Sequence, residues 1–464
     1  MPNRRGIISS AYWSSKESDL SAHGSPNTVK FHVSPGGALQ GKLRVPGDKS
    51  ISHRSIMLGS LAAGVSEVSG FLEGADALAT LAAFRAMGVE IEGPEQGRLR
   101  IHGVGLHGLQ APAAPLDLGN SGTSMRLLCG LLAGQTFDVE LVGDQSLSRR
   151  PMQRVTGPLA SMGARIEATD AGTAPLRIHG NPNLQSLAYR MPVASAQVKS
   201  AILLAGLYAR GQTCVTEPAP TRDHTERMLR GFGYPIDVSG ETACLEGGGC
   251  LQPTHVEVPA DISSAAFFLV GASIAEGSDI VLEHVGINPT RTGIIDILRL
   301  MGASIELSNQ REVGGEPVAD IRVVSQPLQG IEVPPELVPL AIDEFPAIFI
   351  AAACAEGETV VTGAEELRVK ESDRISTMAD GLVALGIDAR PQPDGIRIRG
   401  GQLTGGRINS HGDHRIAMAF AMAALRANGA ITIDDCANVN TSFPGFVELA
   451  QTAGLQVAAE AAEE

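Results

Sequence analysis

The chain of 464 residues lacks the features that mark several large classes of protein. Charged residues interrupt every long apolar stretch, so we expect no segment to span a membrane. Asp and Glu outnumber Lys and Arg by 51 to 36, and the net charge of −15 argues against nucleic acid as the main partner. The six cysteines show no metal-ligand spacing, which favours reduced thiols, no bound metal and a cytoplasmic protein.

What the chain does contain is one pattern written six times. A polar turn with Gly or Ser runs into an apolar helix, and each copy ends in glycine about 70 residues after the last. These copies end at Gly64, Gly134, Gly211, Gly277, Gly357 and Gly429. A second helix follows each copy and ends at Gly88, Gly163, Gly233, Gly302, Gly386 and Gly454. Because glycine adopts the left-handed conformation without a Cβ clash, both sets predict helix C-termini.

Each repeat predicts the order strand, helix, strand, helix, strand, strand. A chain of this length exceeds one ordinary core, so we expect an α/β protein of two domains with three repeats each. The first domain is expected over 47–258, and the second over 30–46 plus 259–455. Because 30–46 would pair with the second half, we expect a two-stranded hinge. The Ser-rich residues 1–29 lack periodicity and are expected to form a disordered tail.

Polar residues gather where the predicted helices of the first half begin. The segment PGDKSISHR, 46–54, puts Lys49, Ser50 and Arg54 at a strand-to-helix turn, where backbone N–H groups and cations can bind a phosphate or carboxylate. The segment GNSGTSMR, 119–126, has glycines that let a ligand approach the backbone. Taken alone, each segment also fits an ordinary capped helix. The other polar residues at such positions are Arg150, Ser195, Gln197 and Arg222.

Charged residues also precede the apolar helices of the second half. Asp343 and Glu344 stand before an otherwise apolar run, and an acid at an apolar boundary is costly unless it is paired or functional. The other charged residues at such positions are Lys370, Glu371, Arg374 and Arg415. Cations from both halves with acids among them suit a reaction between two anionic substrates in which a proton moves.

Eight motifs occur in the order in which 5-enolpyruvylshikimate-3-phosphate synthases carry them. The chain resembles this family from about residue 32 to residue 455, through PGDKSISHR, GNSGTSMR, SRRPM, SAQVKS, TRDHTE, IDEFPA, RVKESDR and DHR. The resemblance implies two inverse α/β-barrel domains of three repeats each. It also implies transfer of the enolpyruvyl group of phosphoenolpyruvate to the 5-hydroxyl of shikimate 3-phosphate, with release of phosphate and without metal or organic cofactor. We expect a monomer whose partners are these two small molecules.

The resemblance assigns the site residues by motif. Those expected to bind shikimate 3-phosphate are Lys49, Ser50, Arg54, Ser195, Ala196, Gln197, Arg222, Asp343 and Lys370. Those expected to bind phosphoenolpyruvate are Lys49, Gly122, Arg150, Gln197, Arg374 and Arg415. The reaction would proceed by addition and elimination through a tetrahedral intermediate, and the residues expected to move its protons are Asp343, Glu371 and Lys49.

Three positions resemble the second branch of this family, which is known for members that tolerate glyphosate, a competitor of phosphoenolpyruvate. They are Leu127, Ala196 and Thr441. Tolerance in that branch is associated with alanine at the position of Gly122, whereas this chain retains glycine.

Three other functions stay open at this point. UDP-N-acetylglucosamine enolpyruvyl transferases share the expected fold, but they have Lys-Asn where this chain has Lys49-Ser50. They also have a reactive cysteine ahead of the Arg-Pro motif, where GDQSLSRRP contains none. A non-catalytic scaffold of the same fold would have lost several of the charged residues, which are present here. An RNA-end cyclase would need a basic groove, which the acidic composition does not favour.

Overall fold

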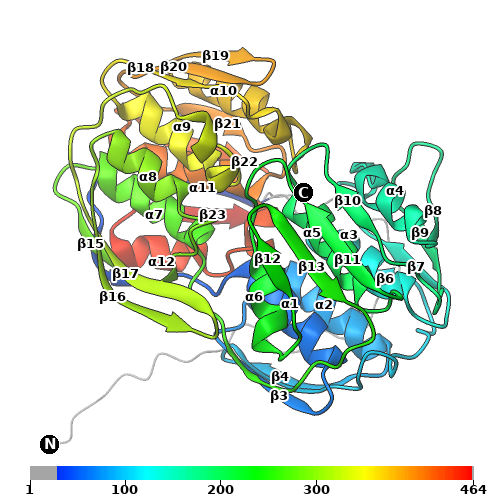
Figure 1. Cartoon of the computed structure of the whole chain (residues 1–464). Coiled ribbons are helices and arrows are strands. Elements are labelled where there is room, and N and C mark those ends of the chain that lie inside the picture. The colour runs from blue at the N-terminus through cyan, green and yellow to red at the C-terminus, as the bar shows by residue number, and fades with distance from the viewer. Residues whose placement is uncertain (1–28, 462–464) are drawn as a thin grey trace, which may run out of the picture.

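The computed structural model describes residues 29–461, which form two lobes of mixed α/β structure (Figure 1). One hydrophobic core joins buried residues of 51–258, and we call this part the first lobe. A second core joins buried residues of 31–45 to those of 260–457, and we call this part the second lobe. No helix of the described residues is long and apolar enough to cross a membrane.

Each lobe contains three small sheets that follow the predicted βαβαββ order. The sheets of the first lobe are β14 (His255–Glu257), β3 (Val65–Ser69), β5 (Arg98–His102) and β4 (Glu90–Glu95); β6 (Leu116–Asp117), β7 (Val139–Val142), β9 (Leu176–His179) and β8 (Arg165–Glu167); and β10 (Ala188–Arg190), β11 (Gln212–Thr216), β13 (Thr242–Glu246) and β12 (Asp237–Ser239). In each of these sheets the first pair of strands is parallel and the other pairs are antiparallel.

The second lobe follows the same scheme. Its sheets are β2 (Gln40–Leu43), β15 (Asp279–Gly286), β17 (Glu316–Val324) and β16 (Ser304–Val313); β18 (Glu358–Val361), β20 (Gly395–Arg399) and β19 (Asp388–Gln392); and β21 (Gly406–Asn409), β22 (Ile431–Asp434), β1 (Val29–Val33) and β23 (Val457–Ala461). A parallel bridge from Glu332 to Val360 stands where the three-stranded sheet would have its fourth strand.

The chain passes between the lobes twice, and the two passages are hydrogen-bonded to each other. The N–H of Asp48 donates to the carbonyl oxygen of Pro259 at 2.8 Å, and the N–H of Asp261 donates to that of Pro46 at 2.9 Å. Strands β1 and β2, which precede the first passage, pair with β22, β23 and β15 of the second lobe. The link between the lobes is therefore a two-stranded connection.

Helices of two kinds alternate along the chain. The inner helices are buried along almost their whole length: α1 (Lys49–Leu61), α3 (Gly122–Ala133), α5 (Ala196–Gly206), α7 (Ile262–Ile274), α9 (Phe345–Cys354) and α11 (His414–Ala423). The outer helices keep one exposed face: α2 (Ala75–Ala86), α4 (Gln153–Ser161), α6 (His224–Gly231), α8 (Gly293–Leu300), α10 (Arg374–Ala384) and α12 (Phe446–Ala453). Helices inside and sheets around them form the inverse arrangement that the resemblance implied (Figure 1).

The glycines that follow the outer helices confirm the prediction of left-handed helix ends. All six have positive φ, from 72° at Gly233 to 117° at Gly454. The glycines after the inner helices differ, because Gly134 and Gly429 do not have positive φ. The inner helices also end before their glycines, as α1 does at Leu61, three residues ahead of Gly64.

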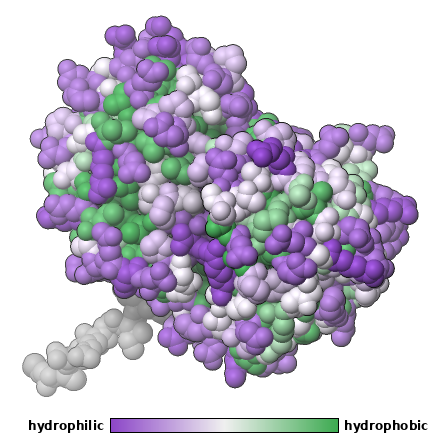
Figure 2. Space-filling view, in the orientation of Figure 1, coloured by the Kyte–Doolittle hydropathy of each residue, from purple (hydrophilic) through white to green (hydrophobic). Residues whose placement is uncertain are grey.

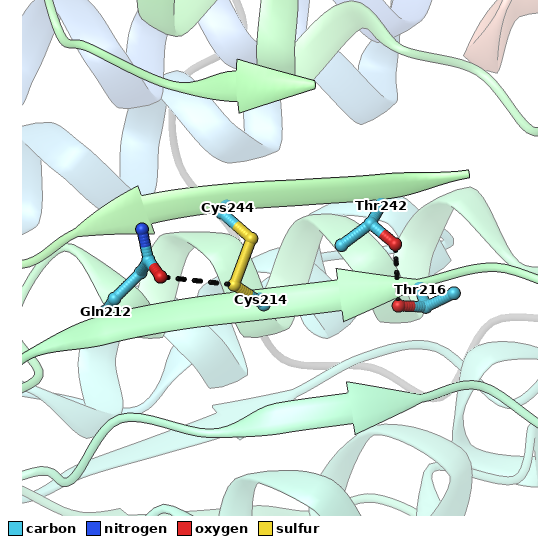
Figure 3. Close-up of a disulfide and its surroundings, with 5 residues drawn as sticks. All are labelled: Gln212, Cys214, Thr216, Thr242 and Cys244. Carbon is cyan, nitrogen blue, oxygen red and sulfur yellow. Dashed lines mark hydrogen bonds between the residues drawn. A yellow bond between two sulfur atoms is a disulfide. The ribbon is translucent and has the colours of Figure 1, made fainter. Parts of the chain in front are cut away.

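The expectation of reduced thiols is wrong for one pair of cysteines. Cys214 of β11 and Cys244 of β13 form a disulfide (Figure 3). They lie 30 residues apart in sequence, but the antiparallel register of these strands places them directly opposite each other. Cys250, which is nearer to Cys244 along the chain, is free.

Small residues allow the inner helices to approach closely. A Cβ added to Gly130 of α3 would collide with the backbone carbonyl of Ala201 in α5. Backbone atoms of a buried helix cannot move aside as a flexible side chain can, so this glycine sets the distance between α3 and α5.

We therefore expect Gly130→Ala to lower the thermal unfolding midpoint, with an overpacking cost of about 1–3 kcal/mol. Gly231→Ala is the matched control, because Gly231 is an exposed helical glycine whose added Cβ would meet only one atom, at 3.9 Å. The control should be neutral or stabilising by up to about 1 kcal/mol. Equal midpoints for the two variants would contradict the close approach of α3 and α5.

Candidate active site

The charged residues singled out from the sequence meet where the lobes face each other. Among the residues singled out, two ion pairs join the lobes: Arg150 with Glu371 at 3.7 Å, and Arg222 with Asp343. Hydrophilic residues line the boundary between the lobes on the face seen in Figure 2. We define the interlobe charge cluster as Lys49, Arg150, Arg222, Asp343, Lys370, Glu371, Arg374, Asp413 and Arg415.

Lys49 enters this cluster from the first turn of α1. Asp48 caps the helix by accepting a hydrogen bond from the N–H of Ile51 at 2.9 Å, which fixes the backbone at the helix start. The ammonium of Lys49 pairs with the buried Asp76 of α2. Lys49 is also one of the charges that lower the pKa of Glu371, so its field reaches the second lobe.

Arg54 lies one turn further along α1 and is 5% exposed. Its guanidinium donates to the hydroxyls of Thr225 at 2.7 Å and Ser200 at 2.9 Å, and to the carbonyl of Ser50 at 3.0 Å. Burial lowers its pKa to about 10. None of its partners is a carboxylate, so within the described residues this cation is held in place without an ion pair.

Gly122 begins α3 and lies against two arginines. A Cβ added to it would come 2.9 Å from Nη1 of Arg126 and 2.9 Å from Nη1 of Arg150. Arg150 is held by the side-chain oxygen of Asn120, to which it donates at 2.6 Å. The missing side chain of Gly122 therefore leaves room for two guanidinium groups at one helix start, where an anion is also favoured by the backbone N–H groups.

The start of α5 presents neutral polar groups. Ser195 is the N-cap and accepts from the N–H of Val198 at 3.4 Å, so its hydroxyl is partly used in capping. Ala196 adds no polar group. Gln197 donates to the hydroxyl of Thr123 in α3 at 3.0 Å, while its buried Oε1 has no partner among the described residues. This oxygen is an acceptor that a ligand hydroxyl could satisfy.

Asp343 lies at the centre of the interlobe charge cluster. It pairs with Arg222 of the first lobe and, in the second lobe, with Lys370 and Arg374, both at 3.5 Å. Burial alone would raise its pKa, but Arg222, Lys370, Arg415 and Arg374 together hold the pKa well below its ordinary value. Asp343 is thus a firmly ionised carboxylate in this arrangement.

Glu371 and Asp413 hold Arg374 from two sides. Arg374 is 1% exposed and donates to Glu371 at 2.6 Å and to Asp413 at 2.8 Å. Burial opposes ionisation of Glu371, yet Arg374 and then Arg150 keep its pKa well below the ordinary value. Arg415, at the start of α11, makes no side-chain ion pair within the described residues, so its guanidinium is available to a ligand.

Asp343 and Glu371 each lie between cations of both lobes. At these distances a carboxylate between cations outweighs their mutual repulsion. The acids therefore connect the lobes rather than only preparing a proton transfer.

One part of the interlobe structure was missed by sequence reasoning. Arg291 is 3% exposed and donates to Asp48 at 3.0 Å and to Asp261 at 3.2 Å, which ties the two passages between the lobes together. Glu344, expected to be paired or functional, accepts from Ser263 and lies 3.9 Å from Arg291, so it is paired. Asp48 and Asp261 are the N-caps of α1 and α7, and an aspartate before an apolar helix is a signal that a sequence can show. Arg291 has no such signal, because no residue near it along the chain indicates its partners.

Asp343→Asn should separate the lobes. The variant leaves Arg222 facing Lys370 and Arg374 without the anion between them, so repulsion favours an open form. Small-angle scattering of the unliganded protein should give a larger radius of gyration. Arg154→Gln is the control, because it removes an exposed interlobe pair with Glu366 that contributes little. An unchanged radius for Asp343→Asn would count against a connecting role of Asp343.

The pKa directions add a prediction on pH. Folding lowers the pKa of Asp343 from 3.8 and that of Glu371 from 4.5. The ion pairs of both carboxylates therefore stabilise the folded protein fully above these ordinary pKa values. This stabilisation is lost only as the pH falls through the lower pKa values of the folded state. The radius of gyration of the unsubstituted protein should then stay constant from about pH 8 to about pH 5. Opening within this window would show that neither carboxylate holds the lobes.

Comparison with known proteins identifies the family. The family model described as EPSP synthase (3-phosphoshikimate 1-carboxyvinyltransferase) matches residues 33–449. The 3-phosphoshikimate 1-carboxyvinyltransferase of Alkalilimnicola ehrlichii is 72% identical over 92% of this chain and 96% of its own length, and that of Methylococcus capsulatus is 71% identical over 92% and 98%. The structure is similar to that of EPSP synthase from Acinetobacter baumannii, with a TM-score of 0.84, 60% identity and coverage of 93% of this chain and all of that one. The enolpyruvyl transferase NikO from Streptomyces tendae, 18% identical with a TM-score of 0.75, shares the fold. The chain therefore belongs to the EPSP synthase family.

Proposed function

We propose that this protein transfers the enolpyruvyl group of phosphoenolpyruvate to the 5-hydroxyl of shikimate 3-phosphate and releases phosphate. Family membership over 92% of the chain supports this activity. The observation that carries it is the interlobe charge cluster, in which cations of both lobes surround Asp343 and Glu371. Two substrates that both carry phosphate and carboxylate groups require such cations, and proton transfer requires carboxylates nearby.

Shikimate 3-phosphate is proposed to bind mainly to the first lobe. Arg54 supports this, since it is a buried cation whose partners are neutral and which can pair with a phosphate. The unpartnered Oε1 of Gln197 can accept from a ring hydroxyl of shikimate 3-phosphate. The full proposed set is Lys49, Ser50, Arg54, Ser195, Ala196, Gln197, Arg222, Asp343 and Lys370.

Phosphoenolpyruvate is proposed to lie between the lobes. Arg150 and Arg126 converge on Gly122 in the first lobe, while Arg374 and Arg415 face the boundary from the second. Its proposed contacts are Lys49, Gly122, Arg150, Gln197, Arg374 and Arg415. Arg126 is a further cation at this place, which the motif comparison did not assign.

The chemistry is proposed to be an addition followed by an elimination. The 5-hydroxyl oxygen bonds to C2 of phosphoenolpyruvate while C3 gains a proton; the C2–O bond to phosphate then breaks while C3 loses a proton. Asp343 is proposed to accept the hydroxyl proton, with Glu371 and Lys49 in the transfers at C3. With four cations lowering its pKa, Asp343 is a weak base, so binding of substrate anions that draw those cations away would raise its basicity.

The finer assignments are proposed on specific residues. Leu127, Ala196 and Thr441 support membership of the second branch of the family. The hydroxyl of Thr441 donates to the carbonyl of Asn438 and offers no cation to a ligand. We infer a cytoplasmic monomer with domains 47–258 and 30–46 plus 259–455, and the two hydrophobic cores support this division.

Transfer to UDP-N-acetylglucosamine is not favoured, because Ser50 and the cysteine-free GDQSLSRRP depart from that family.

Phosphate release tests the function directly. Release from phosphoenolpyruvate should depend on shikimate 3-phosphate and should not occur with UDP-N-acetylglucosamine. Asp343→Asn should lower kcat by about 10²-fold or more, the usual contribution of a general base. Asp279→Asn is the control, because Asp279 is also an ion-paired acid with a lowered pKa but lies on the surface away from the lobe boundary. Near-normal turnover of Asp343→Asn would remove Asp343 from the chemistry.

Glyphosate should inhibit the unsubstituted enzyme more strongly than Gly122→Ala. The added methyl would lie 2.9 Å from Nη1 of both Arg126 and Arg150, so both flexible guanidinium ends would shift. The methyl would also crowd a ligand bound beside them, at a cost of about 1–3 kcal/mol. The inhibition constant should rise roughly 5- to 150-fold, and the KM of phosphoenolpyruvate should also rise because it uses the same Arg150. Gly231→Ala is the remote control. Equal inhibition constants would show that Gly122 does not set tolerance here, and Leu127 would be tested next.

A further inference from the structure

Lys199 is a buried cation of the first lobe to which the proposed function assigns no role. It lies on α5, one helical turn after the N-cap Ser195, and is 2% exposed. Its ammonium donates to Glu217 at 2.9 Å and pairs with Glu226 at 2.8 Å. Burial disfavours its charge, yet Glu226 and Glu217 raise the pKa of Lys199 above its ordinary value. Lys199 is therefore a firmly charged link between α5 and these two acids.

The two acids are also buried, and together they carry more charge than Lys199 compensates. Glu217 is 8% exposed and Glu226 is 3% exposed. Oε2 of Glu226 has no hydrogen-bond partner among the described residues. The excess negative charge favours a further cation nearby, and Glu226 is the acid that does most to keep Arg54 charged. This buried group is thus coupled to a cation of the proposed substrate site.

The acids stand at the two ends of the segment 217–226, which carries Arg222. Glu217 follows the last residue of β11, and Glu226 lies in the first turn of α6. With its second carboxylate oxygen, Glu217 accepts a hydrogen bond from the hydroxyl of Thr221, the residue before Arg222. Lys199 therefore fixes both ends of the segment and, through Glu217, the residue next to Arg222.

The same segment reaches Arg54 through a second set of hydrogen bonds. The hydroxyl of Thr225 accepts from Arg54 at 2.7 Å and donates to Ser200 of α5 at 2.8 Å. Ser200, the residue after Lys199, also accepts from Arg54 at 2.9 Å. Lys199 thus anchors a segment that contacts one proposed phosphate ligand and carries another.

We propose that Lys199 is a positioning residue for shikimate 3-phosphate: it holds Glu217, Glu217 holds Thr221, and Thr221 fixes the backbone that presents Arg222. An arginine on a backbone ordered in advance loses less freedom when it binds an anion, so the network raises affinity without touching the substrate. The inference rests on the proposed function, and it adds residues outside both proposed ligand sets and outside the interlobe charge cluster.

The first test is Thr221→Val, which removes one hydroxyl and no charge. The dissociation constant of shikimate 3-phosphate, measured by calorimetry on the full chain, should rise roughly tenfold, since a hydrogen bond to a charged group is lost. Thr242→Val is the matched control, because Thr242 is also half-buried and its hydroxyl lies 2.8 Å from that of Thr216, outside the network (Figure 3). The control should bind as the unsubstituted protein does.

The second test asks whether Thr221 acts through Lys199. Lys199→Met should also weaken binding of shikimate 3-phosphate, and adding Thr221→Val to it should weaken binding little further, since coupled residues are not additive. The pair of carboxylates left by Lys199→Met can prevent folding. In that case Lys199→Met is combined with Glu217→Gln, which removes one charge of each sign and has the same expected result. Thermal midpoints report whether each variant is folded.

A kinetic measurement separates positioning from general damage. The KM of phosphoenolpyruvate should change much less than the dissociation constant of shikimate 3-phosphate, because Arg374 and Arg415 are proposed to hold phosphoenolpyruvate from the second lobe. Equal rises of the two constants would overturn the inference.

Three further outcomes would also contradict it. Thr221→Val could bind as tightly as the unsubstituted protein, Thr242→Val could lose as much affinity as Thr221→Val, or the effects of Thr221→Val and Lys199→Met could be fully additive. In each case the unsubstituted protein still binds shikimate 3-phosphate, so only the positioning role fails. Absence of binding to the unsubstituted protein would instead overturn the proposed function, and the inference with it.

Discussion

The burial of three helices inside each lobe is the constraint on which the rest of the structure depends. A helix surrounded by other elements can bring polar groups to the surface only at its ends, since its sides must be apolar or small. In this protein the ends that carry Lys49, Gly122, Ala196 and Arg415 are helix starts, where backbone N–H groups have no partner within the helix. The same repeat thus provides both the buried packing of the inner helices and the helix starts that can bind anions.

The interlobe charges show how a site for anions remains stable. Arg374 is almost fully buried, and an isolated buried cation would be very costly. Glu371 and Asp413 compensate it, and Asp343 does the same for Arg222. Asp343 and Glu371, which compensate these cations, are also the carboxylates best placed to move protons. They become free to do so when the anionic groups of a substrate take over as counter-ions of the cations. The same carboxylates therefore cannot connect the lobes and transfer protons at the same time.

Much of the fold was predictable because it is local and repeated. The glycines after the outer helices, such as Gly88 and Gly233, marked the helix ends. Charged residues at helix starts also pointed to Asp343, Glu371 and Arg374. Pairings between distant segments were not predictable from one sequence. Neither the disulfide of Cys214 with Cys244 nor the contacts of Arg291 have a local signal, since both depend on register and on lobe placement.

The pairing of the first two strands has a consequence for synthesis of the chain. Strand β2 ends at Leu43, but its partner β15 begins at Asp279, and β22, the first partner of β1, begins at Ile431. At roughly 5–20 residues per second, a ribosome takes on the order of ten seconds to over a minute to supply these partners. During that time the whole first lobe emerges, so it can fold while the strands before it wait. Strands β1 and β2, the earliest strands of the described residues, are thus among the last to pair.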